Sequence, residues 1–596
     1  MPPKRACDLC YSKKISCDRS DRDAACDWCR HHQLTCTFDR ARARKRCPKP
    51  RIENSVFAVE RSLSSQLQPV DFVLDRVMMD QVNSSTSSSP FVQESQPGHC
   101  GIFAQENFKP DDLLESSMPL AESHLSQLND LGCLDRETAW QILQAYSESS
   151  VRYVLPLVDP VLFQDSLELA YSSEETIQAS QRAQAQGSIL ALISVLSFLD
   201  DHALSLSHDL GMKCASQASA LVEFTNEEAS LLNLQTVSLL VCLAHVHRIR
   251  QLMIIKRLQC AFTGQISGAI KRHETACRLV KELGCHTMGV GGSGLENTAY
   301  NQRENRELRT LFWHSYITDK QIIMRTGMEP LLPDDICDLT LPKDCSASKG
   351  YPIPELKDGG MSLPPYGVLS PCLVGDIQLS ILKSKVWRLL YSTEARQRSE
   401  AELLWAVREL DGELEAWRMS VPTKLRPTFL IADKRHISPP EIDLPSWVRH
   451  HATTLHLEYR HLFITIHQAN ARYQFSKGSD SLEHAWSSSV QSSITLALEA
   501  SRSTLLYLET VLDRLAKEMF WMCIHYPIVA LRTLFVNIVA NPSGPDAKSD
   551  LQLLCSTASL IERMPMSNRL VHGKVYIQKI EEEISGLVEY VRSLKG

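Results

Sequence analysis

Six cysteines near the amino terminus form two copies of the spacing C-x2-C-x6-C, separated by eight residues. Zinc takes four ligands in tetrahedral geometry, and sites made only of thiolates are usually structural. Six thiolates can complete two such sites only if two of them bridge both ions, and the repeat makes Cys7 and Cys26 the natural bridging pair. The spacing therefore predicts a cluster of two Zn²⁺ ions per chain. Its ligands would be Cys7, Cys10, Cys17, Cys26, Cys29 and Cys36.

Two other roles for these cysteines are alternatives. Three disulfides would require an oxidising compartment, but residues 1–6 contain no apolar run of the kind found in a secretory signal. A catalytic zinc ion keeps one position open and usually binds His or a carboxylate as well. His31 and His32 lie between the last two cysteines, and we expect both to be exposed polar residues.

Basic residues surround the cysteines. Residues 1–51 contain 14 Lys and Arg and six Asp, a net charge of +8, whereas the whole chain has −7, so the other 545 residues carry −15. Because Lys and Arg that neutralise phosphates supply most non-specific DNA affinity, this asymmetry predicts a small head that binds a polyanion. A basic run after the last cysteine fits phosphate contacts and also a nuclear import signal. Its residues are Arg40, Arg42, Arg44, Lys45 and Arg46.

The cysteine-rich segment resembles the fungal Zn2Cys6 binuclear-cluster transcription factors. The resemblance rests on residues 6–10, Lys13, Lys14, 17–18, 26–29 and 36–38. It implies a first helix that enters the major groove, often at a CGG triplet, where Lys13 and Lys14 contact bases and phosphates. Tyr11 and Ser16 replace residues that are commonly basic in that family, and the loop 20–25 lacks the usual proline. The triplet is therefore a prediction from the family as a whole.

The rest of the chain predicts a large all-α regulatory domain, joined to the small zinc head by a flexible linker. At 596 residues and 43% hydrophobic content, the chain can bury a large core. The linker contains one amphipathic stretch, which has two interpretations. It forms a short dimerisation helix, or it is too short to form a stable coiled coil. The predicted parts are the zinc head with its basic tail at 1–46, the linker at 47–135 with the dimerisation helix at 52–82, the all-α domain at 136–345, and its helical continuation at 346–596.

Helical spacing of apolar residues begins at about residue 135. Asp135 is a predicted N-cap, and Trp140, Leu143 and Tyr146 would share one face of the helix that follows. The cysteines of this body are scattered, and we expect them to be small buried apolar residues.

Longer apolar runs and proline-rich segments divide the body. The runs 189–199 and 231–244 predict helices that are buried on all sides. Prolines predict loop-rich breaks at 343–375 and 421–447. The apolar run 528–540 is shorter than the roughly 20 residues that span a bilayer and is interrupted by polar residues, so we expect no membrane segment.

Several segments of the body are similar to the fungal-specific transcription factor domain. In chain order they are 154–160 with Phe163, 234–236, 276–284, 307–313, Asp319, Gly327, and Leu341 with Pro342. The resemblance covers about 150–345 and implies an all-helical region that represses, senses a metabolite or binds partners. The basic segment 247–257 departs from the family pattern, and its role is open.

Some polar residues of the body have the spacing of catalytic motifs, but the sequence around them does not fit the structure that those motifs need. Asp334, Asp335 and Asp338 have the D-D-x-x-D spacing of magnesium-diphosphate helices, but Pro333 and Pro342 predict a loop there. We therefore predict that the protein is not an enzyme. His273 is followed by Glu274 but lacks the second His of a zincin.

Other polar residues have a structural interpretation beside a functional one. His456 and His461 are five residues apart and would lie on different faces of a helix, so we expect surface or hydrogen-bonded histidines. Asp319 lies on an apolar stripe, where a carboxylate must find a partner. It would form either an internal salt bridge that holds the core, or a regulatory lock or ligand contact. The other residues of the stripe are Leu308, Phe312, Tyr316 and Ile323.

These features predict a nuclear, zinc-dependent, sequence-specific DNA-binding regulator of RNA polymerase II transcription, directed at catabolic or secondary-metabolite genes. The alternative is a zinc-cluster scaffold that mediates protein contacts or sensing without specific DNA readout. The expected partners are double-stranded DNA, the transcription machinery or co-regulators, a second copy of the chain, and a small-molecule effector.

Overall fold

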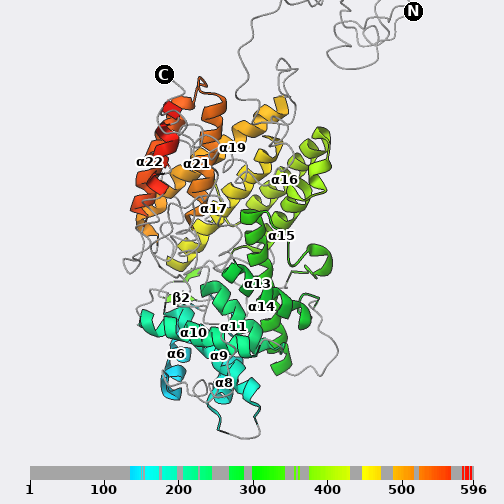
Figure 1. The fold of residues 1–596 in the computed structure, drawn as a ribbon, viewed down its shortest axis with the longest axis vertical. Coiled ribbons are helices and arrows are strands. Elements are labelled where there is room, and N and C mark those ends of the chain that lie inside the picture. The colour runs from blue at the N-terminus through cyan, green and yellow to red at the C-terminus, as the bar shows by residue number, and fades with distance from the viewer. Residues whose placement is uncertain are drawn as a thin grey trace, which may run out of the picture. The chain divides into compact units, whose positions relative to one another are not determined.

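The computed structural model describes a helical body (Figure 1). The chain divides into two units, Met1–Val59 and Glu60–Gly596, and every described residue belongs to the second unit. The described residues are 134–592, except for 150, 152–154, 174–176, 198–205, 226–227, 244–266, 288–298, 342–354, 358–359, 363–374, 424, 430–445, 472–487, 516–522, 565–579, 583 and 590.

The predicted all-α class is confirmed for these residues, apart from one short β-hairpin. The longer helices are α6 (Arg136–Glu148), α8 (Pro160–Tyr171), α9 (Ala179–Leu196), α10 (His208–Phe224), α11 (Leu231–Leu243), α13 (Ser267–Glu282), α14 (Ala299–Thr326), α15 (Ile377–Val386), α16 (Glu400–Ser420), α17 (Ser446–Gln468), α19 (Ser488–Val511), α21 (His525–Ala540) and α22 (Ala547–Arg563). Short helical turns are η2 (Asp334–Ile336), η4 (Trp387–Tyr391), η5 (Ala395–Gln397), η8 (Ala469–Ala471) and η9 (Leu512–Arg514).

Side-chain caps fix where several helices begin. Asp135 accepts a hydrogen bond from Thr138 N at 2.8 Å, so the predicted start of α6 is confirmed. The predicted face of α6 is partly wrong, because Leu143 and Tyr146 are buried but Trp140 is 37% exposed. Ala139 and Ile142 complete the buried face instead.

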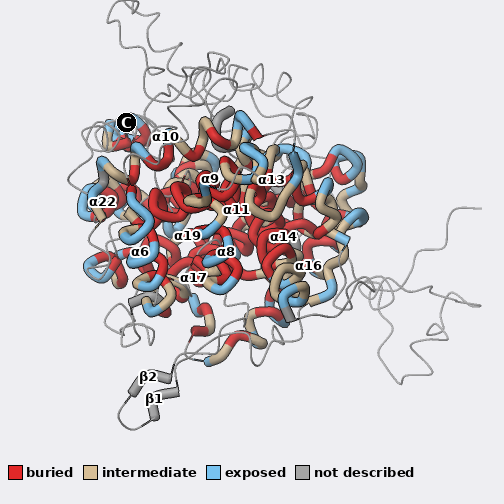
Figure 2. The backbone as a smooth tube through the Cα atoms, turned by 90° about the horizontal axis from the view of Figure 1, so that it is seen from below, coloured by how far each residue is buried: buried red, intermediate tan, exposed pale blue. Residues whose placement is uncertain are grey.

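Two buried helices form the centre of the first half of the body. The prediction from the apolar runs is confirmed, because α9 is buried from Ala183 to Leu196 and α11 from Asn233 to Leu243. Helix α9 packs against α8, α10 and α11, and α11 packs against α13 and α14. Figure 2 shows buried backbone concentrated in these central helices. Burial on all sides explains why neither α9 nor α11 has a polar face.

The second half of the body consists of α15 to α22. Helix α17 packs against α16 and α19, α19 against α21, and α21 against α22, and these helices lie side by side in the green-to-red part of Figure 1. Apolar side chains of α15, α16 and α17 share one core cluster with Ile323 and Met324 of α14. The carboxyl end of α14 is therefore part of the core of the second half.

The predicted breaks are only partly correct. Residues 421–429 contain no helix where they are described, as expected. The segment 343–375 was predicted to be loop, but Glu355–Lys357 (β1) and Gly360–Ser362 (β2) form a short antiparallel hairpin in which Leu356 is opposite Met361.

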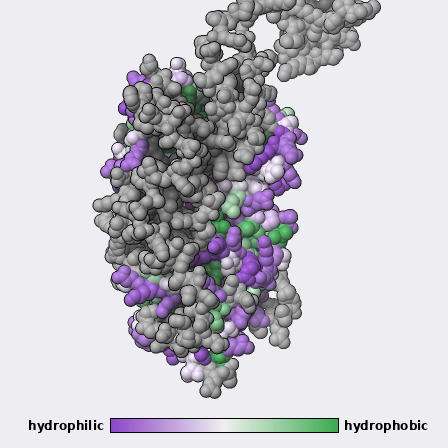
Figure 3. Space-filling model, viewed as in Figure 1, coloured by the Kyte–Doolittle hydropathy of each residue, from purple (hydrophilic) through white to green (hydrophobic). Residues whose placement is uncertain are grey.

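One face of the described residues can be compared by hydropathy. On the face drawn in Figure 3, most coloured residues are hydrophilic and hydrophobic residues form small areas. In the described ranges, no helix has both the length and the apolar character needed to cross a bilayer. The described cysteines are free thiols, and most are buried as predicted, but Cys555 is exposed and Cys337 is half-buried.

Candidate functional site: the buried polar groups around α14

The zinc and DNA sites that the sequence predicts lie outside the described residues. The same holds for the linker, its dimerisation stretch and the basic segment 247–257. They remain predictions. The residues concerned are Cys7, Cys10, Cys17, Cys26, Cys29, Cys36, Lys13, Lys14, Arg40, Arg42, Arg44, Lys45 and Arg46.

Within the described chain, α14 has several buried polar side chains, including Glu307, Asp319 and Lys320. The predicted stripe of this helix is confirmed, because Leu308, Phe312, Tyr316, Asp319 and Ile323 are all buried. At 28 residues, α14 is roughly 42 Å long, and it packs against α11 and α13 of the first half and α15 of the second. A polar group on this helix can therefore join segments that are far apart in the sequence.

Asp319 has the internal partners that its position requires. Its Oδ2 lies 3.0 Å from Lys320 Nζ and accepts a hydrogen bond from Leu332 N at 3.2 Å, while its Oδ1 accepts one from Leu331 N at 3.0 Å. Burial alone would raise the pKa of this carboxyl. The hydrogen bond from His273 and the charge of Lys320 outweigh burial and hold the pKa below its usual value. The interpretation as an internal salt bridge is confirmed.

Lys320 is a partner of Asp319 that the sequence pattern did not predict. It has no solvent exposure, and its ammonium donates to Leu332 O at 2.6 Å and lies 3.8 Å from Asp334 Oδ1. It also lies 4.5 Å from the centre of the Tyr316 ring, where a cation interacts favourably with the π face. A buried ammonium needs such partners because its desolvation is costly.

The aspartates with D-D-x-x-D spacing are used for structure. Asp334 begins the short turn η2, and its Oδ1 accepts hydrogen bonds from Tyr316 Oη at 2.8 Å and from Ser384 Oγ at 2.7 Å. Asp335 is exposed, and Asp338 Oδ1 accepts from Thr340 N at 2.8 Å. These carboxylates do not converge on one point, so the predicted loop context is confirmed and the diphosphate-site interpretation is not supported.

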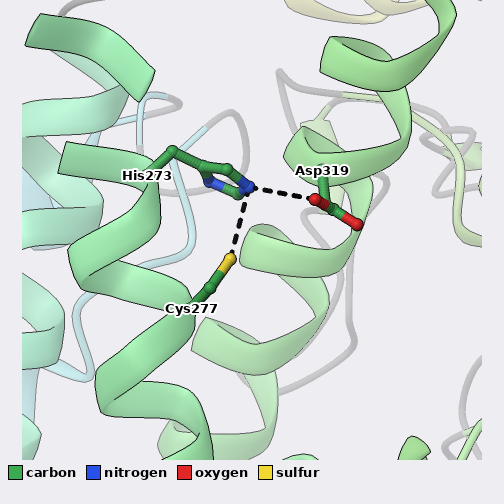
Figure 4. A group of neighbouring side chains, drawn as sticks. All are labelled: His273, Cys277 and Asp319. Atoms are coloured by element: carbon green, nitrogen blue, oxygen red, sulfur yellow. Dashed lines mark hydrogen bonds and ion pairs between the residues drawn. The ribbon is translucent and has the colours of Figure 1, made fainter. Parts of the chain in front are cut away.

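His273 and Cys277 of α13 complete the surroundings of Asp319 (Figure 4). They lie one turn apart on the same helix and point toward α14. The Nε2 atom of His273 is 3.5 Å from Asp319 Oδ1 and 3.3 Å from Cys277 Sγ. Burial, followed by the negative charge of Asp319, raises the pKa of the Cys277 thiol well above its usual value. The i, i+4 spacing of His273 and Cys277 was visible in the sequence, but their meeting with Asp319 was not.

A second buried polar group joins three of the segments that resemble the fungal domain. Glu307 Oε1 accepts from Asp159 N at 3.0 Å and from Gln235 Nε2 at 2.6 Å, and Gln235 Nε2 also donates to Leu157 O at 2.9 Å. Asp159 in turn forms an ion pair with Arg303 at 3.1 Å. Burial is the main cause that raises the pKa of Glu307 to about 8. Glu307 is therefore mostly protonated at neutral pH.

A third group connects α14 to α15 and α17. Glu458 Oε1 accepts from Gln321 Nε2 at 2.8 Å and from Lys383 Nζ at 2.9 Å. Gly375 has φ +139°, and a Cβ at this position would lie 3.0 Å from Gln321 Nε2 and 3.1 Å from Glu458 Oε2. Only glycine fits such a backbone beside this ion pair without strain.

The histidines of α17 have partners inside the protein. His456 Nε2 lies 3.2 Å from Leu425 O, and His461 Nε2 lies 3.3 Å from His525 Nε2. Burial, followed by nearby positive charge, lowers the pKa of His461 to about 3, so this pair is neutral at physiological pH. His461 and Arg532 line a cavity of about 30 Å³, which has room for only one or two water molecules.

Part of the helical body is similar to a known domain family. Residues 196–418 match the fungal specific transcription factor domain. This range begins at the end of α9 and ends in α16, and it includes all of α14. The match agrees in kind with the resemblance seen in the sequence, and the two ranges share residues 196–345. No solved structure matches the chain.

Curated relatives share part of this chain. An ABC-transporter-regulating transcription factor of Aspergillus fumigatus is 30% identical over 296 residues, which are 47% of this chain and 29% of the relative. A protein of the same name from Aspergillus oryzae is 29% identical over 295 residues, with the same coverage. An uncharacterized transcriptional regulatory protein of Schizosaccharomyces pombe is 22% identical over 318 residues, 52% of this chain and 36% of the relative. The chain thus spans less than a third of the two Aspergillus proteins.

Proposed function

We propose that this protein is a zinc-dependent, sequence-specific DNA-binding regulator of RNA polymerase II transcription. The observation that carries the proposal is the match of residues 196–418 to the fungal specific transcription factor domain. The six-cysteine repeat and the +8 charge of residues 1–51 supply the DNA-binding part of the proposal. Such a protein acts in the nucleus and is not an enzyme.

The proposed chemistry of the head follows from its donor set. Six thiolates with two bridging members suit two Zn²⁺ ions, and binding of metal would supply much of the folding free energy of so short a segment. Lys13 and Lys14 would contact bases and phosphates in the major groove, at a CGG-like triplet. The basic run 40–46 would hold the neighbouring phosphates.

We propose that the helical body regulates this head. The three polar groups on α14 support the idea, because each joins α14 to a different segment through buried charges or hydrogen bonds. Buried ion pairs stabilise a packing only when their partners are in place. A molecule that separates one of these groups would therefore shift the body between discrete packings.

The test is DNA binding by the full chain at two salt concentrations. Duplexes recovered by selection from a random pool are compared with shuffled duplexes, for the natural chain and for Cys26→Ala. We expect the natural chain to prefer the selected duplex, with affinity that falls steeply with salt, and Cys26→Ala to lose the preference. Full operator affinity in Cys26→Ala would reject the bridged cluster. Absence of any salt-dependent DNA binding would favour the scaffold alternative.

The names of the Aspergillus relatives suggest the first class of target genes to test. Both are described as regulators of ABC transporters, so we propose genes for ABC transporters as targets of this chain. Genome-wide mapping of occupied sites would test this, and would also return the DNA motif and the spacing of half-sites. Occupied sites confined to genes of other classes would reject this target class without affecting the DNA-binding proposal.

A further inference from the structure

The group formed by His273, Cys277 and Asp319 has the composition of a metal site. The three side chains offer one imidazole nitrogen, one sulfur and one carboxylate oxygen, and these donor atoms all lie within 4.8 Å of one another. All three residues are buried, at about 1% exposure. Nitrogen, sulfur and oxygen donors of these types are the ligands that Zn²⁺ uses in proteins.

The donor distances fit a tetrahedral ion. Zinc–ligand bonds of about 2.0 to 2.3 Å at tetrahedral angles place pairs of donor atoms about 3.3 to 3.6 Å apart. The distance from His273 Nε2 to Cys277 Sγ is 3.3 Å, and that from Nε2 to Asp319 Oδ1 is 3.5 Å. The third pair, Cys277 Sγ and the Asp319 carboxylate oxygen, lies within 4.8 Å. The two helices already hold the donors on facing surfaces (Figure 4).

The carboxylate of Asp319 can serve a metal and Lys320 at the same time. Lys320 Nζ contacts Oδ2 at 3.0 Å, whereas His273 faces Oδ1. A metal ion held by Oδ1 would therefore leave the salt bridge in place.

Binding of Zn²⁺ would displace the proton of the buried Cys277 thiol, because a metal ion ligates the thiolate form. The reaction balances as Zn²⁺ plus a thiol giving a zinc-bound thiolate and one released proton.

We propose that His273, Cys277 and Asp319 bind a divalent, zinc-like ion inside the helical body, separate from the head. Three protein ligands leave one position open for an exchangeable ligand, as in zinc sites that are not purely structural. His273 Nε2, the nitrogen that faces Asp319 and Cys277, is the one that would bind the ion. The bound ion would fasten α13 to α14 and so make the packing of this domain respond to metal supply.

The test counts metal on the full chain. Each protein is stripped with chelator, reloaded with Zn²⁺ and washed, and bound zinc is measured per chain. The variants are Cys277→Ala and His273→Gln. The matched control is Cys285→Ala, because Cys285 is also a buried thiol and its Sγ donates to Val280 O at 3.3 Å. Zinc held by the six cysteines of the head is common to all variants and cancels in the comparison.

We expect Cys277→Ala and His273→Gln to bind one zinc ion fewer than Cys285→Ala. Equal zinc content in the three variants would overturn the proposal. Because alanine at a buried site can unfold a protein, Cys277→Ser provides a second variant, and circular dichroism checks its helix content. Proton release is a further readout: zinc titration near neutral pH should release one proton more from Cys285→Ala than from Cys277→Ser. Equal release would also overturn the proposal. Neither result depends on DNA binding.

Discussion

Replacing Asp319 by Asn tests whether the buried ion pair on α14 stabilises the helical body. The change removes one negative charge and leaves Lys320 fully buried. The ammonium keeps Leu332 O at 2.6 Å and Asp334 Oδ1 at 3.8 Å, but it loses the carboxylate at 3.0 Å. Asparagine keeps one oxygen acceptor, but its amide nitrogen cannot accept, so one of the backbone hydrogen bonds from Leu331 N and Leu332 N is lost together with the charge.

The magnitude follows from burial. Removing one partner of a buried ion pair costs about 3–5 kcal/mol, because the other charge stays desolvated. We expect about 3 kcal/mol, the lower end, since the Leu332 carbonyl and Asp334 still solvate the ammonium. A protein domain is stable by only about 5–15 kcal/mol, so this loss is easily measured.

The assay is guanidinium unfolding of the full chain, monitored by circular dichroism. A chelator is present so that bound metal does not contribute to the measured stability. The control is Glu415→Gln, which breaks the exposed pair with Arg418 and should cost about 0–1 kcal/mol. Adding Lys320→Met to Asp319→Asn removes the unpaired charge and should recover part of the loss. Equal midpoints for Asp319→Asn and Glu415→Gln would refute the reasoning.

The pH dependence gives a second check on the same pair. The pKa of Asp319 is lower in the folded protein than its ordinary value of 3.8, so the folded state holds the carboxylate ionised where the unfolded chain binds a proton. Its contribution to stability is complete above 3.8 and is lost as the pH falls through the lower folded value. The difference between the natural protein and Asp319→Asn should therefore persist at neutral pH and shrink only in strong acid.

The remaining predictions concern the head and two other buried sites. Lys14→Ala should weaken specific DNA binding by about 1–3 kcal/mol at fixed salt, and an unchanged binding curve would reject that contact. The pKa of Glu307 is about 8 in the folded protein against 4.5 ordinarily, so stability should fall as the pH rises from 4.5 to 8, by at most about 1.4 kcal/mol per pH unit. Glu307→Gln, which resembles the protonated acid, should reduce this dependence of stability on pH. If the melting temperatures of the two proteins changed equally with pH, the prediction would be contradicted. Gly375→Ala should lower the unfolding midpoint because its Cβ would crowd Gln321 Nε2 at 3.0 Å, whereas Gly412→Ala, with no atom within 4 Å, should raise stability by up to about 1 kcal/mol. Equal midpoints for the two glycine variants would reject the steric argument.

Local patterns predicted much of the helical body correctly. Asp135 marks the start of α6 because a cap acts within a few residues of itself. The apolar runs predict the interior helices α9 and α11 because burial on all sides leaves no polar face to place. The prediction that Trp140 is buried was wrong. The spacing of apolar residues defines one face of a helix, but it does not show how far neighbouring elements cover the margin of that face. The hairpin in 343–375 was missed because three-residue strands are too short for an alternating pattern to be visible.

The sequence by itself predicted the start of α6 and the interior helices α9 and α11. It also predicts a zinc head, because those ligands lie close together along the chain. Only the tertiary structure decided what Asp319 contacts. Its partner His273 lies 46 residues away, on α13. Lys320 is adjacent to Asp319 in the sequence, and both side chains hydrogen-bond to the backbone of residues 331–332. The spacing of residues along one helix specifies a direction for each side chain, whereas the packing of a second helix against it is set by the whole core.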